Sequence, residues 1–159
     1  MPEFVDIGKS APAFNAPDQD GESHRLSAYK GDWVVLYFYP KDSTPGCTKE
    51  ACAFRDAAKD LQKAGAKVFG VSPDDVKSHA KFAEKQSLNF PLLADPEQKI
   101  CTKYGVWQEK SMYGKKYMGA VRTTYLIDPK GKVAARWDKV KVPGHVEAVL
   151  DTLAEHVDA

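Results

Sequence analysis

The sequence lacks the features that would place it in several broad classes of protein. Its 159 residues contain no apolar run near the roughly 20 residues that a membrane-spanning helix needs. Lysine and arginine number 23 against 22 acidic residues, so no charge excess favours nucleic acid or an anionic membrane. The N-terminal stretch has neither the basic start nor the apolar core of a secretory signal. We therefore expect no nucleic-acid partner and no membrane association.

Cysteine is scarce, with three residues in the chain. A low and odd count does not fit a secreted domain held by disulfides, so a reducing cytoplasm is the expected compartment. The chain has no C-x-x-C pair of the thioredoxin type, and no cluster of His and Cys supplies the four ligands of a structural zinc. No metal or other cofactor is predicted. Each histidine is expected to be a surface residue or a helix cap: His24, His79, His145 and His156.

What the chain does contain is an alternation of strand and helix patterns. WVVLYFY at 33–39 is an apolar run of β-branched and aromatic residues, which is typical of a strand buried on both faces. The other predicted elements are a hairpin around DQDGES, a helix from TPGC to the Gly65 stop, a strand at 67–73, a helix at 74–87, a short strand and short helix within 89–107, a hairpin across 123–137 and an amphipathic helix at 145–157. This order indicates an α/β fold with a mixed central sheet flanked by helices, for which a thioredoxin-like fold is the natural candidate. Residues 1–159 are expected to form a single domain.

The segment YPKDSTPGCTKEAC at 39–52 holds two of the three cysteines. Thr44 is a suitable helix N-cap and Pro45 a suitable first helical residue, which puts Cys47 in the first turn. Unpaired backbone N–H groups and the positive end of the helix dipole favour a thiolate in such a position. The alternative for Cys47 is a small buried filler, and its place directly after a Pro-Gly turn argues against that.

Cys52 lies five residues further along the same predicted helix. Helix parameters give a Cα separation of roughly 8.6 Å from Cys47, beyond the ~7 Å limit for a disulfide. Two interpretations remain. Either the cysteines are unrelated and Cys52 packs on an alanine-rich helix face, or they form a disulfide only when the first turns of the helix unwind.

The segment YPKDSTPGCTKEACAFRD resembles the active-site segment of the peroxiredoxins, in particular the bacterioferritin comigratory protein or peroxiredoxin Q group. The family pattern P-x-x-x-T/S-x-x-C is met by Pro40, Thr44 and Cys47. The resolving cysteine common in this group, five residues after the first, is met by Cys52. Similar stretches on both sides, including YGVWQEKSMYGKKYMGAVRTTYLIDPKGKV, extend the resemblance over nearly the whole chain.

This resemblance implies a thiol-dependent peroxidase that reduces hydrogen peroxide and organic hydroperoxides without metal or haem. Cys47 would attack the peroxide and become a sulfenic acid, with Thr44 bonded to the thiolate or the peroxide. Pro40 would shield the site from water, and Arg122 would lie beside the thiolate. Cys52 would condense with the sulfenic acid, and thioredoxin or a similar dithiol would reduce the disulfide. Members of this group are often monomers.

Some residues and one alternative function stay open. Arg122 precedes the apolar stretch TTYLI, where an unpaired charge is costly, although a surface ion pair is the alternative. Cys101 has no counterpart in the resemblance and is expected to pack in the core. Trp107, Tyr113 and Tyr117 suit either the mouth of a pocket or simple packing. The alternative function is a redox sensor or chaperone-like protein switched by the same disulfide. General disulfide exchange is disfavoured because C-x-x-C is absent.

Overall fold

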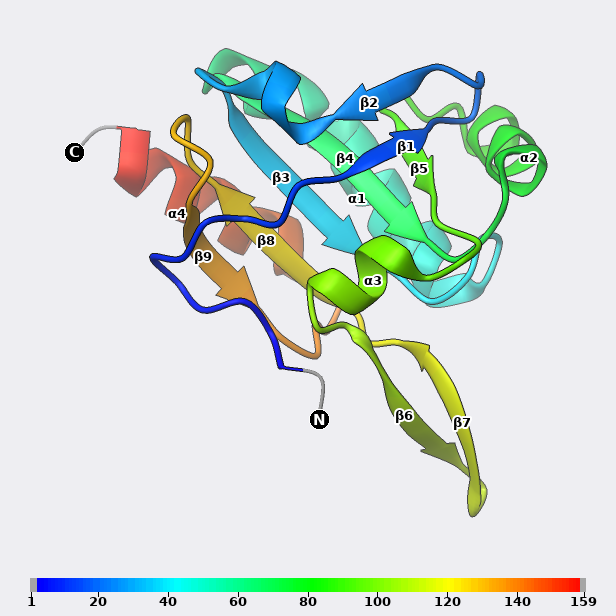
Figure 1. The fold of residues 1–159 in the computed structure, drawn as a ribbon. Coiled ribbons are helices and arrows are strands. Elements are labelled where there is room, and N and C mark those ends of the chain that lie inside the picture. The colour runs from blue at the N-terminus through cyan, green and yellow to red at the C-terminus, as the bar shows by residue number, and fades with distance from the viewer. Residues whose placement is uncertain (1–2, 158–159) are drawn as a thin grey trace.

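The computed structural model describes residues 3–157 and is built around a five-stranded mixed sheet (Figure 1). Its strands are β3 (Trp33–Phe38), β4 (Ala66–Ser72), β5 (Leu92–Ala94), β8 (Thr123–Ile127) and β9 (Val133–Trp137). They lie in the order β5-β4-β3-β8-β9. β3, β4 and β5 run parallel, whereas β8 pairs antiparallel with both β3 and β9. The predicted α/β class and thioredoxin-like mixed sheet are confirmed.

Helices cover one face of the sheet, and shorter elements cover the other (Figure 1). The first layer contains α1 (Pro45–Lys63), α2 (Val76–Gln86) and α4 (His145–Val157). The second contains η1 (Leu26–Tyr29), α3 (Lys99–Lys103) and the N-terminal segment, which carries the small hairpin of β1 (Asn15–Pro17) and β2 (Ser23–Arg25). The helix, strand and hairpin patterns in the sequence therefore predicted most of these elements to within a few residues.

Strand β3 lies at the centre of the sheet and has a core on each side. Val35 and Tyr37 belong to the core beneath α1, whereas Leu36 and Phe38 belong to the core on the opposite face. Because successive side chains of a strand point to opposite faces, both sets must be apolar. This explains why 33–39 is an uninterrupted apolar run rather than an alternating one.

One hairpin was not predicted from the sequence. β6 (Trp107–Met112) and β7 (Lys115–Ala120) form an arm that projects from the body of the molecule (Figure 1). Trp107 packs against the core at its base, whereas Tyr113 at its tip is 99% exposed and Tyr117 is 43% exposed. The two tyrosines therefore do not pack in the core.

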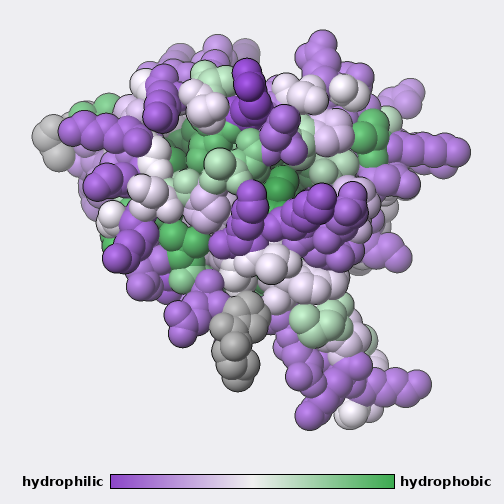
Figure 2. Space-filling model, in the orientation of Figure 1, coloured by the Kyte–Doolittle hydropathy of each residue, from purple (hydrophilic) through white to green (hydrophobic). Residues whose placement is uncertain are grey.

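Figure 2 shows that mostly hydrophilic side chains cover the face in view, with apolar ones gathered in a recess.

Both outer strands of the sheet are bonded to other parts of the chain. Beside β9, Gly8 N donates to Val133 O at 2.8 Å, and Val133 N donates to Lys9 O at 2.9 Å. Beside β5, the side-chain amide of Gln19 takes the place of a neighbouring strand. Leu92 N donates to its Oε1 at 2.8 Å, and its Nε2 donates to the carbonyl of Phe90 at 3.0 Å.

Two of the histidine predictions were wrong. His79 in α2 is fully buried, and His145 at the start of α4 is 6% exposed. Each has a polar partner far away in the sequence: His79 contacts Asp42, and His145 Nε2 lies 2.8 Å from Thr124 Oγ1. His156 is exposed, as expected.

Among the helices of residues 3–157, none is long and apolar enough to cross a membrane.

Candidate active site

Cys47 lies in the first turn of α1, and its side chain is almost completely buried. The helix begins at Pro45, and Thr44 occupies the N-cap position with an extended backbone. The Thr44 hydroxyl does not cap the helix; it donates to the carbonyl of Lys41 at 2.9 Å. Because no side chain caps α1, its first N–H groups remain available to an anion at the helix N-terminus.

Arg122 places a positive charge beside the sulfur. Its Nη2 donates to Cys47 Sγ at 3.3 Å, and its Nη1 donates to Glu50 Oε1 at 2.6 Å. It is held there because it directly precedes β8, the strand next to β3. A guanidinium presents several N–H donors in a fixed geometry, so it can bond both the sulfur and an oxygen brought beside it. Gly46 allows the close approach, since a Cβ at that position would lie 3.2 Å from Nη2.

Glu50 completes this group of charges, and the sequence reasoning missed it. Its side chain is fully buried, its Oε1 is bonded to Arg122, and its Oε2 has no partner. Burial outweighs the attraction of Arg122 and raises the pKa of Glu50 to about 7. Burial opposes the charge of Arg122 too, yet Glu50 and Cys47 raise the pKa of that guanidinium overall. One signal was available: Glu50 follows Cys47 by three residues, and so lies on the same helix face.

The floor of the site is aromatic. Tyr37 of β3 stacks on Phe54 of α1 with ring centroids 4.6 Å apart. Gly70 leaves room for that ring, since a Cβ there would be 2.9 Å from the Tyr37 hydroxyl. This hydroxyl has no hydrogen-bond partner, and burial followed by the charge of Glu50 raises its pKa well above the usual range. The acidic and cationic groups beside Cys47 therefore lie against buried aromatic rings.

Cys52 is separate from this group. It is half-buried on α1, and its Sγ donates to Gln86 Oε1 of α2 at 3.5 Å. Both cysteines are free thiols in one continuous helix. The helix parameters therefore still give a Cα separation of roughly 8.6 Å, too long for a disulfide. Pro40 is half-buried in the loop between β3 and α1.

Cys101 lies on the other side of the sheet. It is fully buried in the core beneath α3, whereas Cys47 belongs to the core beneath α1. Burial, followed by the nearby charge of Asp95, raises the pKa of its thiol. Such a thiol is unreactive, so Cys101 packs as the sequence predicted.

A buried cysteine at a helix N-terminus, beside an arginine in a thioredoxin-like fold, is the arrangement of a thiol-based peroxidase. The chain belongs to the AhpC/TSA family, whose model matches residues 7–136. Among its relatives, peroxiredoxin Bcp of Bacillus subtilis is 48% identical over 151 residues, covering 95% of this chain and 96% of that protein. Peroxiredoxin Bcp of Escherichia coli is 47% identical over 149 residues, covering 94% and 96%. The protein is therefore a thiol-dependent peroxidase, an oxidoreductase.

Solved structures agree with this assignment. A crystal structure of a Xylella fastidiosa PrxQ mutant superposes with a TM-score of 0.92 at 38% identity, covering 97% of this chain and 98% of that one. The bacterioferritin comigratory protein of Xanthomonas campestris, described for its alkyl peroxide reduction activity, superposes with a TM-score of 0.89 at 44% identity. That match covers 96% of this chain and 99% of the other. The recognition of the Bcp or peroxiredoxin Q group from the sequence is confirmed.

Proposed function

We propose that Cys47 is the peroxidatic cysteine and that it reduces hydrogen peroxide and organic hydroperoxides. The observation that carries this proposal is the 3.3 Å contact between Arg122 Nη2 and the buried Cys47 Sγ at the start of α1. The thiolate attacks one peroxide oxygen, the O–O bond breaks, and the other oxygen leaves as an alkoxide or hydroxide that takes up a proton. Arg122 and the free N–H groups of the first turn stabilise the charge that develops on the leaving oxygen.

Cys52 is the resolving cysteine in this proposal. The sulfenic acid on Cys47 loses its hydroxyl as water when the Cys52 sulfur attacks, and an intramolecular disulfide forms. Since the folded helix keeps the two residues too far apart, the first turns of α1 must open before this step. Thioredoxin or a similar dithiol then returns both residues to thiols, a cycle suited to a reducing cytoplasm.

Thr44 and Pro40 have supporting roles. The Thr44 hydroxyl, now bonded to the Lys41 carbonyl, can turn to bond an incoming peroxide because a side-chain hydroxyl rotates freely. Pro40, half-buried beside the loop, limits the access of water to the sulfur. An intramolecular disulfide needs no second subunit, so we propose that the protein acts as a monomer.

Two cysteine variants test the assignment. We expect Cys47→Ser to abolish the consumption of peroxide, measured with thioredoxin, thioredoxin reductase and NADPH. We expect Cys52→Ser to consume one equivalent of peroxide but to stop cycling. Intact mass after one equivalent, with peptide mapping, should show a 47–52 disulfide in the parent protein. Residual turnover in Cys47→Ser, or full cycling in Cys52→Ser, would contradict the assignment.

A further inference from the structure

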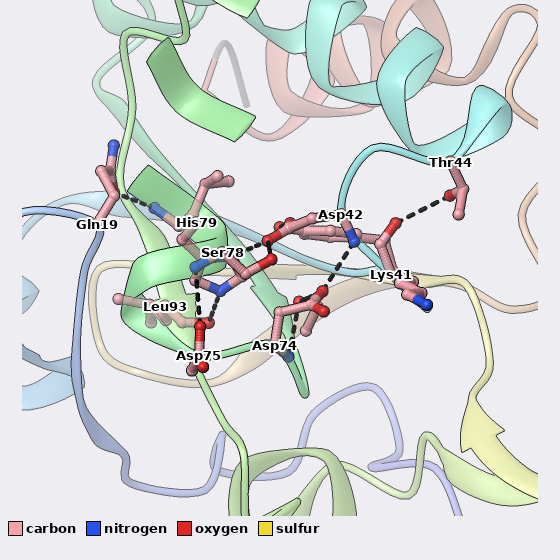
Figure 3. A network of polar contacts seen from close by, with 12 residues as sticks. Gln19, Lys41, Asp42, Thr44, Asp74, Asp75, Ser78, His79 and Leu93 are labelled. Atoms are coloured by element: carbon pink, nitrogen blue, oxygen red, sulfur yellow. Dashed lines mark hydrogen bonds and ion pairs between the residues drawn. The ribbon is translucent and has the colours of Figure 1, made fainter. Parts of the chain in front are cut away.

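Asp42 is the centre of a buried polar network in the loop before Cys47 (Figure 3). Its carboxylate accepts hydrogen bonds from the hydroxyl of Tyr39 at 2.6 Å and the hydroxyl of Ser78 at 2.8 Å. His79 Nδ1 lies 2.7 Å from the same carboxylate, and both side chains are buried, at 0% and 3% exposed. The backbone N–H of Asp42 also donates to Asp74 Oδ2 at 2.8 Å. Four contacts thus hold one loop residue.

His79 joins the loop to the sheet as well as to α2. Its Nε2 lies 2.9 Å from the carbonyl of Leu93 in β5. A carbonyl can only accept, so Nε2 donates to it, while Nδ1 faces the carboxylate of Asp42. Although Asp42, Asp74 and His79 lie close enough to face a cation, their facing atoms already bond to one another, to hydroxyls or to the backbone. The network therefore bonds to other groups of the protein, and we call these contacts of Asp42 and His79 the clamp.

On the Cys52 side, the polar contacts of α1 with α2 and the segment after it are partly exposed to water. Cys52 Sγ donates to Gln86 Oε1 at 3.5 Å, a weak thiol bond, and Arg55 Nη1 donates to the Gln86 carbonyl at 2.6 Å from a partly exposed side chain. Asn89 Nδ2 donates to the Arg55 carbonyl at 3.3 Å in an exposed position. Bonds exposed to water are exchanged for bonds to solvent at little net loss, whereas opening a buried pair leaves uncompensated polar groups.

We propose that Asp42 and His79 are positioning residues that hold the peroxidatic loop, residues 40–44, against α2 and the sheet throughout the cycle. This inference rests on Cys47 being the reacting cysteine. The helix around Cys52 opens while the loop stays fixed, so Cys52 makes the larger movement towards Cys47. Because the loop stays in place, the site for peroxide is restored as soon as the disulfide is reduced.

Hydrogen exchange on the reduced and disulfide forms tests the direction of opening. We expect amides of residues 49–55 to exchange more than about tenfold faster in the disulfide form, since their helix bonds are broken. The amide of Asp42, bonded to Asp74, should keep its protection. Equal acceleration at Asp42 and in the helix would overturn the proposal.

The variant His79→Gln, made together with Cys52→Ser to isolate the first step, tests positioning. An amide cannot span both Asp42 and Leu93, so we expect single-turnover oxidation by peroxide to slow about tenfold or more. The matched control is Asp75→Ala, which removes the α2 cap to Ser78 N without touching Asp42. It should lower the melting temperature yet leave this rate within about twofold. If both variants slowed the reaction equally, His79 would have only a structural role, and the proposal would be refuted.

Three further measurements keep the outcome clear. If His79→Gln does not fold, Ser78→Ala removes one bond to Asp42 and should slow the peroxide step by a smaller factor; an unchanged rate in that variant counts against the clamp. With Cys52 present, disulfide formation should not slow in either α2 variant. Cys47→Ser, assayed in parallel, separates the two proposals. If it still consumes peroxide, the proposed function fails, whatever the loop does.

Discussion

Glu50 and Arg122 together set the charge beside Cys47. Glu50 is the rare buried carboxyl with one oxygen bonded to a guanidinium and the other without a partner. Such a group changes its protonation near neutral pH rather than far below it, because burial raises the pKa of Glu50 to about 7. The sulfur therefore faces a pair whose net charge changes near neutral pH.

Glu50→Gln should remove this change in charge. At pH 6 the parent carboxyl is mostly protonated and resembles the amide, so we expect the two proteins to react with peroxide at rates within about twofold. At pH 8 the parent holds Arg122 through a charge-assisted bond that the amide cannot match, and the variant should be slower by about fivefold. Single-turnover rates measured from pH 5.5 to 8.5 check this. Parallel pH profiles would contradict it.

The same residue affects stability in a defined direction. The pKa of Glu50 is raised by burial from 4.5 in the unfolded chain to about 7, so the folded protein binds this proton more tightly. The stability that this tighter proton binding gives the folded protein is complete below about pH 4.5 and is lost as the pH rises through about 7. Urea unfolding at pH 5 and pH 8 should therefore show a smaller decline in Glu50→Gln than in the parent.

Motif residues could be predicted from the sequence, whereas their buried partners could not. Pro40, Thr44 and Cys47 lie within one short segment whose turn and helix signals are local. Glu50 meets Arg122 across 72 positions, and Asp42 meets His79 across 37. Nothing in the spacing of these residues shows that the fold brings them together. A histidine on a helix with polar neighbours reads as a surface residue until its partner is known.

At the scale of elements, α1 combines a reactive end with an anchored middle. Ala51, Phe54 and Leu61 are fully buried against the sheet, but only the first two lie in the stretch that the proposed Cys47–Cys52 disulfide requires to unwind. In the proposed cycle, burial of Phe54 opposes formation of the disulfide, since its ring would have to leave the stack with Tyr37. The stability of this stretch would then set how long the proposed sulfenic acid persists.

Phe54→Ala should reveal that opposition. We expect the free energy of unfolding to fall by about 3–5 kcal/mol, and disulfide formation after a peroxide pulse to become faster. Leu61→Ala is the matched control, because it should cost about 2–5 kcal/mol outside the opening stretch and leave the disulfide step unchanged. Tryptophan fluorescence in a stopped-flow instrument follows the disulfide step in both variants. If Leu61→Ala accelerated that step equally, global stability rather than local opening would control it.

The β6–β7 arm shows where strand prediction from sequence failed. Prediction of strands depends on alternating burial, and most side chains from Glu109 to Met118 are exposed on both faces. Its turn uses Tyr113 at φ 53° and Gly114 at φ 79°. A tyrosine in the left-handed region is uncommon, so the usual Asn-Gly or Asp-Gly signal of a tight hairpin was missing.

At the scale of the whole molecule, the two cores share the central strand β3. Residues of the same strand pack beneath α1 and on the opposite face, so neither layer can be lost without exposing the other. We therefore propose that residues 1–159 behave as one domain. Unfolding in urea, followed by fluorescence and by circular dichroism, should give coincident single transitions. Two separated transitions would contradict this.

His145 should make that transition sensitive to acid. Burial, followed by the charge of Arg122, lowers the pKa of His145 from 6.5 to about 4. The unfolded chain binds this proton more readily, so stability falls as the pH drops from about 6.5 to about 4. His145→Gln can keep a bond to Thr124, and we expect it to lose less stability between pH 7 and pH 5 than the parent.

The bonds along both outer strands have a consequence for association between molecules. An uncovered strand edge is a template on which another chain can add a strand, the first step towards aggregation. Here the segment around Gly8 occupies one edge and the amide of Gln19 the other. Shortening the chain at its start would remove that protection, so an N-terminal truncation could yield an intact active site in a protein that precipitates.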